Sequence, residues 1–279
     1  MILSVVIIAY NEEANIGRAL ASVQPLVADG KGEIIVVDSG STDRTVEIAK
    51  SFGAKVFIEE WKGYAAQKNS VIDKASGEWI LSLDADEEVD EELRGALRHY
   101  ILGEAAHSVR DGVAFYRTSF LATTVTALQI RRKNYFLGRW IRHGGFWPDP
   151  KLRLFRRGVG RFEERAVHET VQVTGTKRQF PTGVLLHHSY PTLADYLDHM
   201  NRYSSLGAEM VVAKGRVRFS AFNMVLRPIA TFVYNYFFRL GFLDGHEGLL
   251  LHLYHAVYVS WKYAKAWEMA HKGNGAQHE

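Results

Sequence analysis

The stretch that decides the fold is residues 3–9, Leu-Ser-Val-Val-Ile-Ile-Ala, followed directly by Tyr10, Asn11 and Glu12. A short apolar run that is rich in β-branched residues and bounded by polar ones is typical of a strand buried on both faces. Strands of this kind occupy the centre of a parallel sheet. The run therefore predicts a central strand whose carboxyl end is followed by polar side chains.

Strands and helices alternate through the first third of the chain. Further strands are expected at residues 33–37, 55–58 and 79–83. Helices are expected up to about residue 23 and over residues 43–52 and 64–75. Because strands that alternate with helices pair in parallel, the pattern predicts an α/β fold with a doubly wound, mostly parallel sheet.

The alternation fades after about residue 110, where a short strand is expected at residues 113–117. Helical periodicity then returns in three stretches towards the carboxyl end of the chain. These are residues 192–213, 219–240 and 245–268. Pro228 is expected to end or kink the second of them, because proline lacks the N–H that a helix interior needs.

Composition places the chain among ordinary globular proteins. Of its 279 residues, 47% are hydrophobic and 23% are charged, which excludes disordered and fibrous classes. The chain has no cysteine, so disulfides and thiolate metal sites are excluded, in keeping with a reducing cytoplasm. The first residues lack the basic flank and cleavage site of a secretory signal, so we expect no export.

Polar side chains follow three of the four expected strands. Asn11 and Glu12 follow the first, Asp38 follows the second, and Asp84 and Asp86 follow the fourth. In parallel α/β sheets, ligands bind beyond the carboxyl ends of the strands. These residues are therefore expected to converge on one binding site.

Asp84-Ala85-Asp86 presents two carboxylates beside a small residue at a strand end. Mg²⁺ and Mn²⁺ commonly bind one or two carboxylates together with substrate phosphates, so the motif favours a metal-assisted nucleoside diphosphate site. The alternative is that Asp84 and Asp86 cap and begin the helix expected near Asp90. We expect residues 87–92 to take that role instead.

Four motifs carry a resemblance to a known family. They are Val5 to Glu12, Val37 to Asp43, Gly77 to Trp79 and Leu83 to Glu87. In order and spacing they resemble family 2 glycosyltransferases over about the first 95 residues. The resemblance implies a GT-A fold, a metal at Asp86 and Asp84, and transfer of a sugar from a nucleoside diphosphate, usually with inversion at the sugar carbon.

The same resemblance implies roles for residues near the nucleotide. Ala9, Tyr10 and Glu12 would border the nucleoside, and Asp38 would hydrogen-bond the base, for which uracil is suited. The alternative for Asp38 is a carboxylate that forms a turn, although Asp43 is better placed to cap the next helix. Lys68 would offset diphosphate charge, unless it is an ordinary surface lysine.

The second half of the chain resembles the subgroup that glucosylates the inner core of lipopolysaccharide. The motifs are Pro148 to Arg157, Val167 to Glu169 and Leu186 to Tyr190. The resemblance implies that Glu169 is the catalytic base, with His168 as its competitor and a surface or paired glutamate as the alternative. His188 would complete the metal shell, unless it is a structural histidine.

On this basis the chain is expected to have three parts. Residues 1–110 would form the nucleotide-sugar-binding half of the GT-A domain, and residues 111–191 its acceptor-binding half. Residues 192–279 would form an amphipathic helical extension.

A basic stretch lies in the expected acceptor half. Residues 131–165 hold eleven Lys and Arg against three Asp and Glu, with aromatic residues interleaved. The stretch has no nucleic-acid recognition motif, so a phosphorylated acceptor or anionic lipid is favoured over nucleic acid. Arg153 and Arg156 are our candidates for an acceptor phosphate, although some of these arginines are expected to be only solvated.

An aromatic stretch with interspersed Arg and Lys covers residues 219–267. It is typical of helices that lie in a lipid headgroup layer, and the alternative is packing on the catalytic domain. Within this stretch, the longest run without Asp, Glu, Lys or Arg is residues 248–261, which falls short of the about 20 residues that span a bilayer.

Together these patterns predict a cytoplasmic, metal-dependent hexosyltransferase, with peripheral contact at the cytoplasmic face of the membrane as an open alternative. The expected donor is UDP-glucose and the expected acceptor a lipopolysaccharide-core or other lipid-linked glycan. The rivals are a sugar nucleotidyltransferase, whose first loop is usually Gly-rich and basic rather than acidic, and an inactive membrane-associated GT-A scaffold. The oligomeric state is not indicated.

Overall fold

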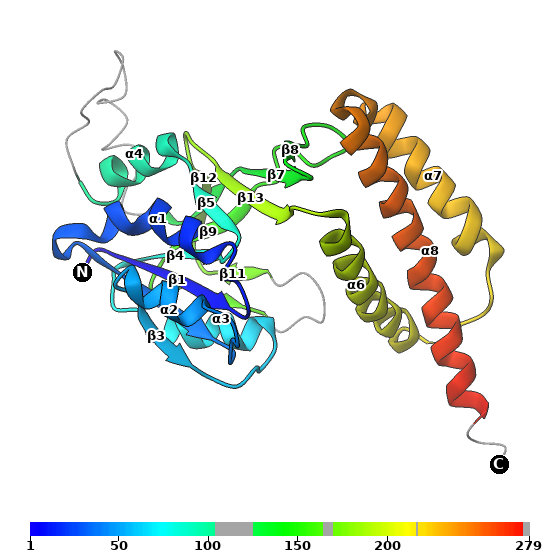
Figure 1. Cartoon of the computed structure of the whole chain (residues 1–279), viewed down its shortest axis with the longest axis horizontal. Coiled ribbons are helices and arrows are strands. Elements are labelled where there is room, and N and C mark those ends of the chain that lie inside the picture. Colours follow the sequence, from blue (N-terminus) through cyan, green and yellow to red (C-terminus); the bar gives the residue numbers. More distant parts are fainter. Residues whose placement is uncertain (104–124, 164–169, 216, 276–279) are drawn as a thin grey trace. The chain divides into compact units, whose positions relative to one another are not determined.

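The computed structural model describes residues 1–103, 125–163, 170–215 and 217–275. As far as they are described, residues 1–132, 149–165 and 169–187 form one compact unit, and residues 133–148, 166–168 and 188–279 form a second. Figure 1 shows the elements of both units. The strand expected at residues 113–117 and the first boundary of our three-part division lie outside the described residues.

The first unit is built on a seven-stranded sheet with the order β12-β6-β9-β4-β1-β2-β3. The strands are β1 (Leu3–Ala9), β2 (Gly32–Asp38), β3 (Lys55–Ile58), β4 (Trp79–Asp84), β6 (Val125–Ile130), β9 (Lys151–Arg156) and β12 (Thr176–Gln179). β1 to β4 pair in parallel, whereas β9 runs antiparallel to β4 and β6. The expected α/β fold with a mostly parallel sheet is confirmed. β1 lies near the centre of the sheet, between β4 and β2, and both of its faces are buried.

In the described part of the first unit, four α-helices accompany this sheet. They are α1 (Ile16–Val27), α2 (Thr45–Ser51), α3 (Tyr64–Asp73) and α4 (Glu91–Tyr100). α2 begins later than expected, because Asp43 Oδ1 accepts the backbone N–H of Thr45 and so caps its first turn. Asp90 caps α4 as expected, but Glu87 and Glu88 lie in β5 (Glu87–Val89) instead of the helix start.

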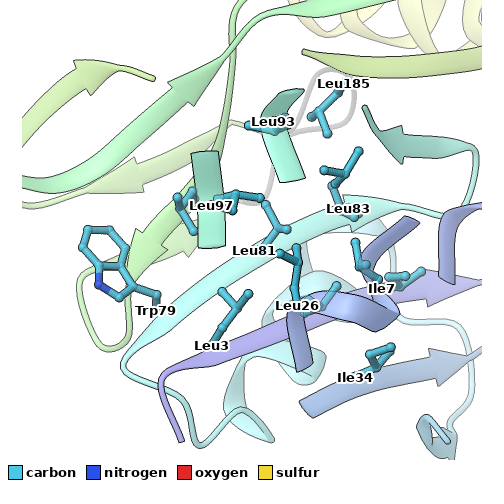
Figure 2. Packing of buried hydrophobic residues seen from close by; sticks show 14 of the residues in the cluster. Leu3, Ile7, Leu26, Ile34, Trp79, Leu81, Leu83, Leu93, Leu97 and Leu185 are labelled. Atoms are coloured by element: carbon cyan, nitrogen blue, oxygen red, sulfur yellow. The ribbon is translucent and has the colours of Figure 1, made fainter. Parts of the chain in front are cut away.

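The largest hydrophobic cluster fills the space between the sheet and α1 and α4 (Figure 2). Leu3 and Ile7 from β1 and Leu81 and Leu83 from β4 alternate along their strands, so each pair faces the same side of the sheet. Leu97 of α4 is also buried in this cluster. This packing fixes β1 and β4 side by side and thereby sets the positions of their carboxyl ends.

A buried carboxylate ties the opposite end of the sheet together. Glu33 is 7% exposed and accepts hydrogen bonds from Ser4 Oγ at 2.8 Å, Ser76 Oγ at 2.6 Å and Lys55 Nζ at 2.8 Å. Burial raises the pKa of the Glu33 carboxyl, but the hydrogen bonds from Lys55, Ser76 and Ser4 outweigh it and lower the pKa from 4.5 to about 2.

Glu33→Gln should therefore destabilise the protein at neutral pH by on the order of 2 kcal/mol, since the share from half-exposed Lys55 is screened. The pKa is lower in the folded state, so the stabilisation is complete above about 4.5 and is lost as the pH falls towards about 2. Urea unfolding of wild type and variant across this range should show the two free energies converging in acid. A difference independent of pH would contradict this assignment.

Smaller strands complete the first unit. β10 (Gly160–Phe162) pairs with β11 (Val171–Val173), and residues 185–187 of β13 (Leu185–Tyr190) pair antiparallel with β5. The β5 pairing brings the first residues of β13 beside the segment that follows β4.

The second unit contains the hairpin of β7 (Arg132–Phe136) and β8 (Arg139–Trp140), followed by helices. α6 (Leu193–Ala213) begins with a capping box formed by Thr192 and Asp195, and α8 (Gly245–Gly275) is the last helix. The segment expected to be one helix over residues 219–240 is helical without a break over residues 221–238, but its turns at Phe222–Leu226 and Tyr234–Phe238, on either side of α7 (Arg227–Val233), are π-helical. Pro228 lies in the first turn of α7, where no N–H is required.

Phe136, Ile141, Tyr196 and Leu251 form the buried core of the second unit. Among the described residues, no helix is both long enough and apolar enough to cross a bilayer.

Candidate functional site

The carboxyl ends of β1, β2 and β4 meet at one edge of the sheet in the first unit. Ala9 is in register with Asp38, and Ile8 is in register with Asp84. The expected convergence of polar residues from three strands is therefore present. Ala9 and Ala85 are buried, whereas the Tyr10 side chain is 58% exposed and available to a ligand.

The loops after β1 and β2 are joined by a ladder of hydrogen bonds. The backbone N–H of Asn11 donates to Ser41 Oγ at 2.8 Å and that of Glu12 to Thr45 Oγ1 at 2.7 Å. In return, Asn11 Oδ1 accepts the backbone N–H of Thr42 at 2.8 Å. The two loops are thus held in one arrangement before any ligand binds.

Asp38 is fully buried within this ladder. Its Oδ1 accepts the backbone N–H groups of Gly40 and Ser41 at 2.9 and 2.8 Å, and its Oδ2 accepts the Ser41 hydroxyl at 2.5 Å. The carboxylate therefore forms the turn, which is the alternative given above for Asp38. Contact with a nucleotide base stays a prediction for this residue.

Asp84 is held between two cations. Lys68 Nζ lies 2.8 Å from Asp84 Oδ1, and the Arg153 guanidinium donates to Asp84 Oδ2. Burial raises the pKa of the Asp84 carboxyl, but Arg153 and then Lys68 outweigh it, so the pKa lies well below its ordinary value. Lys68 is 7% exposed and is therefore not the surface lysine of the alternative.

The ion pairs continue away from Asp84 through residues that the sequence did not indicate. Arg153 also donates to Glu87 Oε1 at 2.7 Å, and Arg132 lies 3.0 Å from the same oxygen. Arg132 in turn pairs with Asp149 at 2.8 Å. Glu87 is 0% exposed, and the two arginines are its ion-pair partners in this buried position.

Asp86 has a different partner from Asp84. Its Oδ2 lies 3.2 Å from Nε2 of His187 in β13. Burial raises the pKa of the Asp86 carboxyl, but the charge and the hydrogen bond of His187 outweigh it and lower the pKa below its ordinary value. Asp86 is thus ionised at neutral pH.

The histidine beside Asp86 is His187, whereas we expected His188. Successive side chains of a strand point to opposite faces, and the His188 ring instead stacks on Tyr135 with centroids 5.0 Å apart. The two-residue periodicity of a strand makes the two histidines point to opposite faces, but it does not determine which one faces the carboxylates.

Glu12 adds a third acidic group near this edge. The pKa of the Glu12 carboxyl is raised, chiefly by burial. A hydrogen bond from Asn15 lowers the pKa, but the negative charges of Asp86, Asp43 and Asp84 raise it further. An accumulation of negative potential of this kind favours a bound cation.

The donor atoms at Asp86 fit a divalent metal. Asp86 and His187 supply one carboxylate and one imidazole, whereas Asp84 is already neutralised by two cations. Among the described residues, no three His, Asp or Glu side chains form a ready-made metal cage. Phosphate oxygens of a nucleotide would therefore have to supply further ligands.

One expected site residue, Arg156, lies elsewhere. Arg156 pairs with Glu78 and packs over Trp79, at the opposite end of β4 from Asp84, so it lies apart from Arg153. Arg153 and Arg156 are three residues apart on β9. Because β9 runs antiparallel to β4, Arg156 lies beside the start of β4 and Arg153 lies towards its carboxyl end. Glu169 and His168 lie outside the described residues.

Comparison with known proteins identifies relatives of the whole chain. The family model described as "Glycosyl transferase family 2" matches residues 4–160. A lipopolysaccharide core biosynthesis glycosyltransferase, LpsC of Rhizobium meliloti, is 30% identical over 278 residues, which cover 95% of this chain and 92% of the relative. An uncharacterized glycosyltransferase of Rickettsia typhi is 30% identical over 257 residues, covering 89% and 80%.

Solved structures give weaker likenesses. TarS residues 1–349 of S. aureus in complex with UDP has a TM-score of 0.46 at 16% identity, covering 98% of this chain and 92% of that one. Glucosyl-3-phosphoglycerate synthase of Mycobacterium tuberculosis, with Mn²⁺, UDP and glucosyl-3-phosphoglycerate, has a TM-score of 0.34 at 24% identity, covering 48% and 44%. At these TM-scores neither structure supports an inference about substrate.

Proposed function

The chain belongs to glycosyl transferase family 2, and from this premise we propose that it is a metal-dependent, inverting hexosyltransferase. Its donor is a nucleoside diphosphate hexose, for which we propose UDP-glucose. Its acceptor is a lipopolysaccharide-core or other lipid-linked glycan, as the name of the Rhizobium relative suggests. We place it in the cytoplasm, in peripheral contact with the cytoplasmic face of the inner membrane.

One observation carries this proposal. Asp86, with His187 at 3.2 Å, follows β4 at the sheet edge where β1 and β2 also end. A Mn²⁺ or Mg²⁺ ion on Asp86 and His187 would offset the negative charge of the donor diphosphate. Lys68 and Arg153 keep Asp84 ionised beside it, and the proposed contacts of Ala9, Tyr10, Glu12 and Asp38 orient the nucleoside.

The transfer step requires a base and no covalent enzyme intermediate. The acceptor hydroxyl oxygen attacks the anomeric carbon from the face opposite the diphosphate, and Glu169 takes the hydroxyl proton. The bond between the anomeric carbon and the diphosphate oxygen breaks, and its electron pair leaves with the nucleoside diphosphate. The support for Glu169 is its match to the family motif, with His168 as the competing base.

Product analysis with a panel of donors tests the proposal. The purified protein should release nucleoside diphosphate from one nucleotide sugar when Mn²⁺ or Mg²⁺ is present, and faster when truncated lipopolysaccharide is added. Release of pyrophosphate from a nucleoside triphosphate and a sugar phosphate would instead identify a nucleotidyltransferase. If no donor and acceptor pair gives turnover, the remaining hypothesis is an inactive membrane-associated GT-A scaffold.

Glu169→Gln tests the base. We expect the rate of transfer to fall by at least about 10²-fold, because general-base catalysis contributes this much or more. The affinity for the nucleotide sugar should stay unchanged, since the glutamine keeps the size of the side chain. Single-turnover rates and donor titrations measure the two quantities, and His168→Gln is the matched comparison. An unchanged rate in Glu169→Gln together with a loss in His168→Gln would transfer the role to His168.

A further inference from the structure

A cationic pocket lies among the helices of the second unit, outside the site described above. It has a volume of about 240 Å³, and its lining includes Lys214, Arg218, Asn223 and Tyr263. The pocket is therefore formed where the end of α6, the π-helical turn at Phe222–Leu226 and α8 come together. Figure 1 shows α7 and α8 running alongside each other in this unit.

The cations at the pocket lack ion-pair partners among the described residues. Lys214 and Arg218 line the pocket, and Arg227 and Lys262 lie over the ring of its lining residue Tyr263. None of these four cations forms an ion pair there, although Arg227 does donate to the Tyr263 hydroxyl. The sequence contains no Asp or Glu between Glu209 and Asp244. Burial and then the charges of Arg227 and Lys214 lower the pKa of Lys262. An unbalanced cluster of this kind favours an anionic ligand.

Apolar side chains are exposed immediately beside the pocket-lining residues. Ser220, Asn223 and Met224 line the pocket, and the neighbouring Phe219 and Phe222 are 63% and 61% exposed. Further exposed apolar side chains follow along the same segment, namely Val225, Leu226, Ile229, Tyr234, Phe237, Phe238, Leu240, Phe242 and Leu243. We call residues 217–243 the apolar segment. An exposed apolar surface of this extent is uncommon in a protein that contacts only water.

We propose that the apolar segment docks on an anionic phospholipid bilayer, with a headgroup phosphate bound in the cationic pocket. The combination of large apolar side chains, arginines and no carboxylates matches the boundary between headgroups and acyl chains. The segment lies in the boundary without spanning the bilayer, in agreement with the absence of a spanning helix among the described residues. This inference deepens the peripheral location proposed above and does not depend on sugar transfer.

Vesicle sedimentation with the full chain tests the charged part. The protein should bind vesicles of phosphatidylcholine mixed with phosphatidylglycerol far more tightly than phosphatidylcholine alone, and added salt should weaken the binding. Lys214→Gln with Arg218→Gln should lower the affinity by about tenfold or more, since each cation near an anionic surface contributes about fivefold. The matched control is Lys177→Gln with Arg178→Gln in exposed β12, which should bind as the wild type does.

Two isoleucine variants test the apolar part. Ile229 in the apolar segment is 55% exposed, and Ile58 in β3 is 67% exposed. Ile229→Ser should weaken vesicle binding by about tenfold, because the side chain no longer enters the apolar layer, whereas Ile58→Ser should not. Circular dichroism and donor hydrolysis without acceptor should match the wild type in both variants, which separates this test from that of the enzymatic proposal.

Three outcomes would overturn the proposal. One is binding that does not distinguish the two vesicle compositions, and another is equal loss in the two isoleucine variants. The third is a dimer in light scattering that Ile229→Ser dissociates, together with no vesicle binding, because the apolar segment would then be a subunit interface.

Discussion

Arg153→Met should lower the free energy of unfolding by about 3–5 kcal/mol, the cost of leaving a buried charge without its partner. The Arg153 side chain is 8% exposed and donates to both Asp84 and Glu87. Glu87 is 0% exposed, and among the described residues Arg132 would be its one remaining ion-pair partner. The measurement is the urea unfolding curve at neutral pH, compared with that of the wild type.

Arg156→Met provides the matched control, since it makes the same change three residues further along β9. Arg156 pairs with a half-exposed Glu78 at the protein surface, so its loss should cost about 1 kcal/mol or less. Adding Glu87→Gln to Arg153→Met should recover part of the lost stability, because it removes one of the uncompensated charges. Equal effects of Arg153→Met and Arg156→Met would show that the buried ion pairs do not stabilise the fold.

The strands of the first unit could be predicted because their signal is local. Residues 3–9 and 79–83 are buried on both faces, so an apolar run alone identifies them. The register of parallel strands then brings Ala9, Asp38 and Asp84 to one edge, which required no knowledge of the side chains in between.

The partners of the carboxylates could not be predicted, because the chain supplies them from remote antiparallel strands. Arg132 is 45 residues from Glu87, and His187 is 101 residues from Asp86. Their positions depend on the registers of β7 and β13, and no periodicity in the sequence sets those registers. The turn formed by Asp38, in contrast, was indicated by the Ser-Gly-Ser that follows it.

The helical part shows a second limit. Residues 219–240 have the spacing of one amphipathic helix, yet π-helical turns replace α-helical ones at Phe222–Leu226 and Tyr234–Phe238. Apolar periodicity is too coarse to distinguish an α-helical turn from a π-helical one, which contains one more residue in each hydrogen-bonded ring. Pro228 was the one local signal of the change, and α7 begins beside it.

Asp86→Asn should reduce metal-dependent transfer by about 10³-fold or more, since a bound metal contributes several kcal/mol to charge stabilisation. Asparagine keeps the size of the side chain but lacks the negative charge that a divalent cation requires. Stability should change little, because among the described residues Asp86 is ion-paired with His187 alone, whereas Asp84→Asn would leave Lys68 and Arg153 without a shared anion. The two substitutions should thus separate activity from stability.

Manganese binding measured by electron paramagnetic resonance, with nucleoside diphosphate present, distinguishes a lost metal site from a damaged active site. Asp86→Asn should abolish binding, and His187→Ala should weaken it by about tenfold, the lower range for groups that support a metal site. His188→Ala is the matched control and should bind Mn²⁺ as the wild type does, because its ring stacks on Tyr135. If His188→Ala weakens Mn²⁺ binding and His187→Ala does not, His188 and not His187 is the metal ligand. If Asp86→Asn retains both Mn²⁺ affinity and turnover, the metal lies elsewhere, and the chemistry proposed for this sheet edge is wrong.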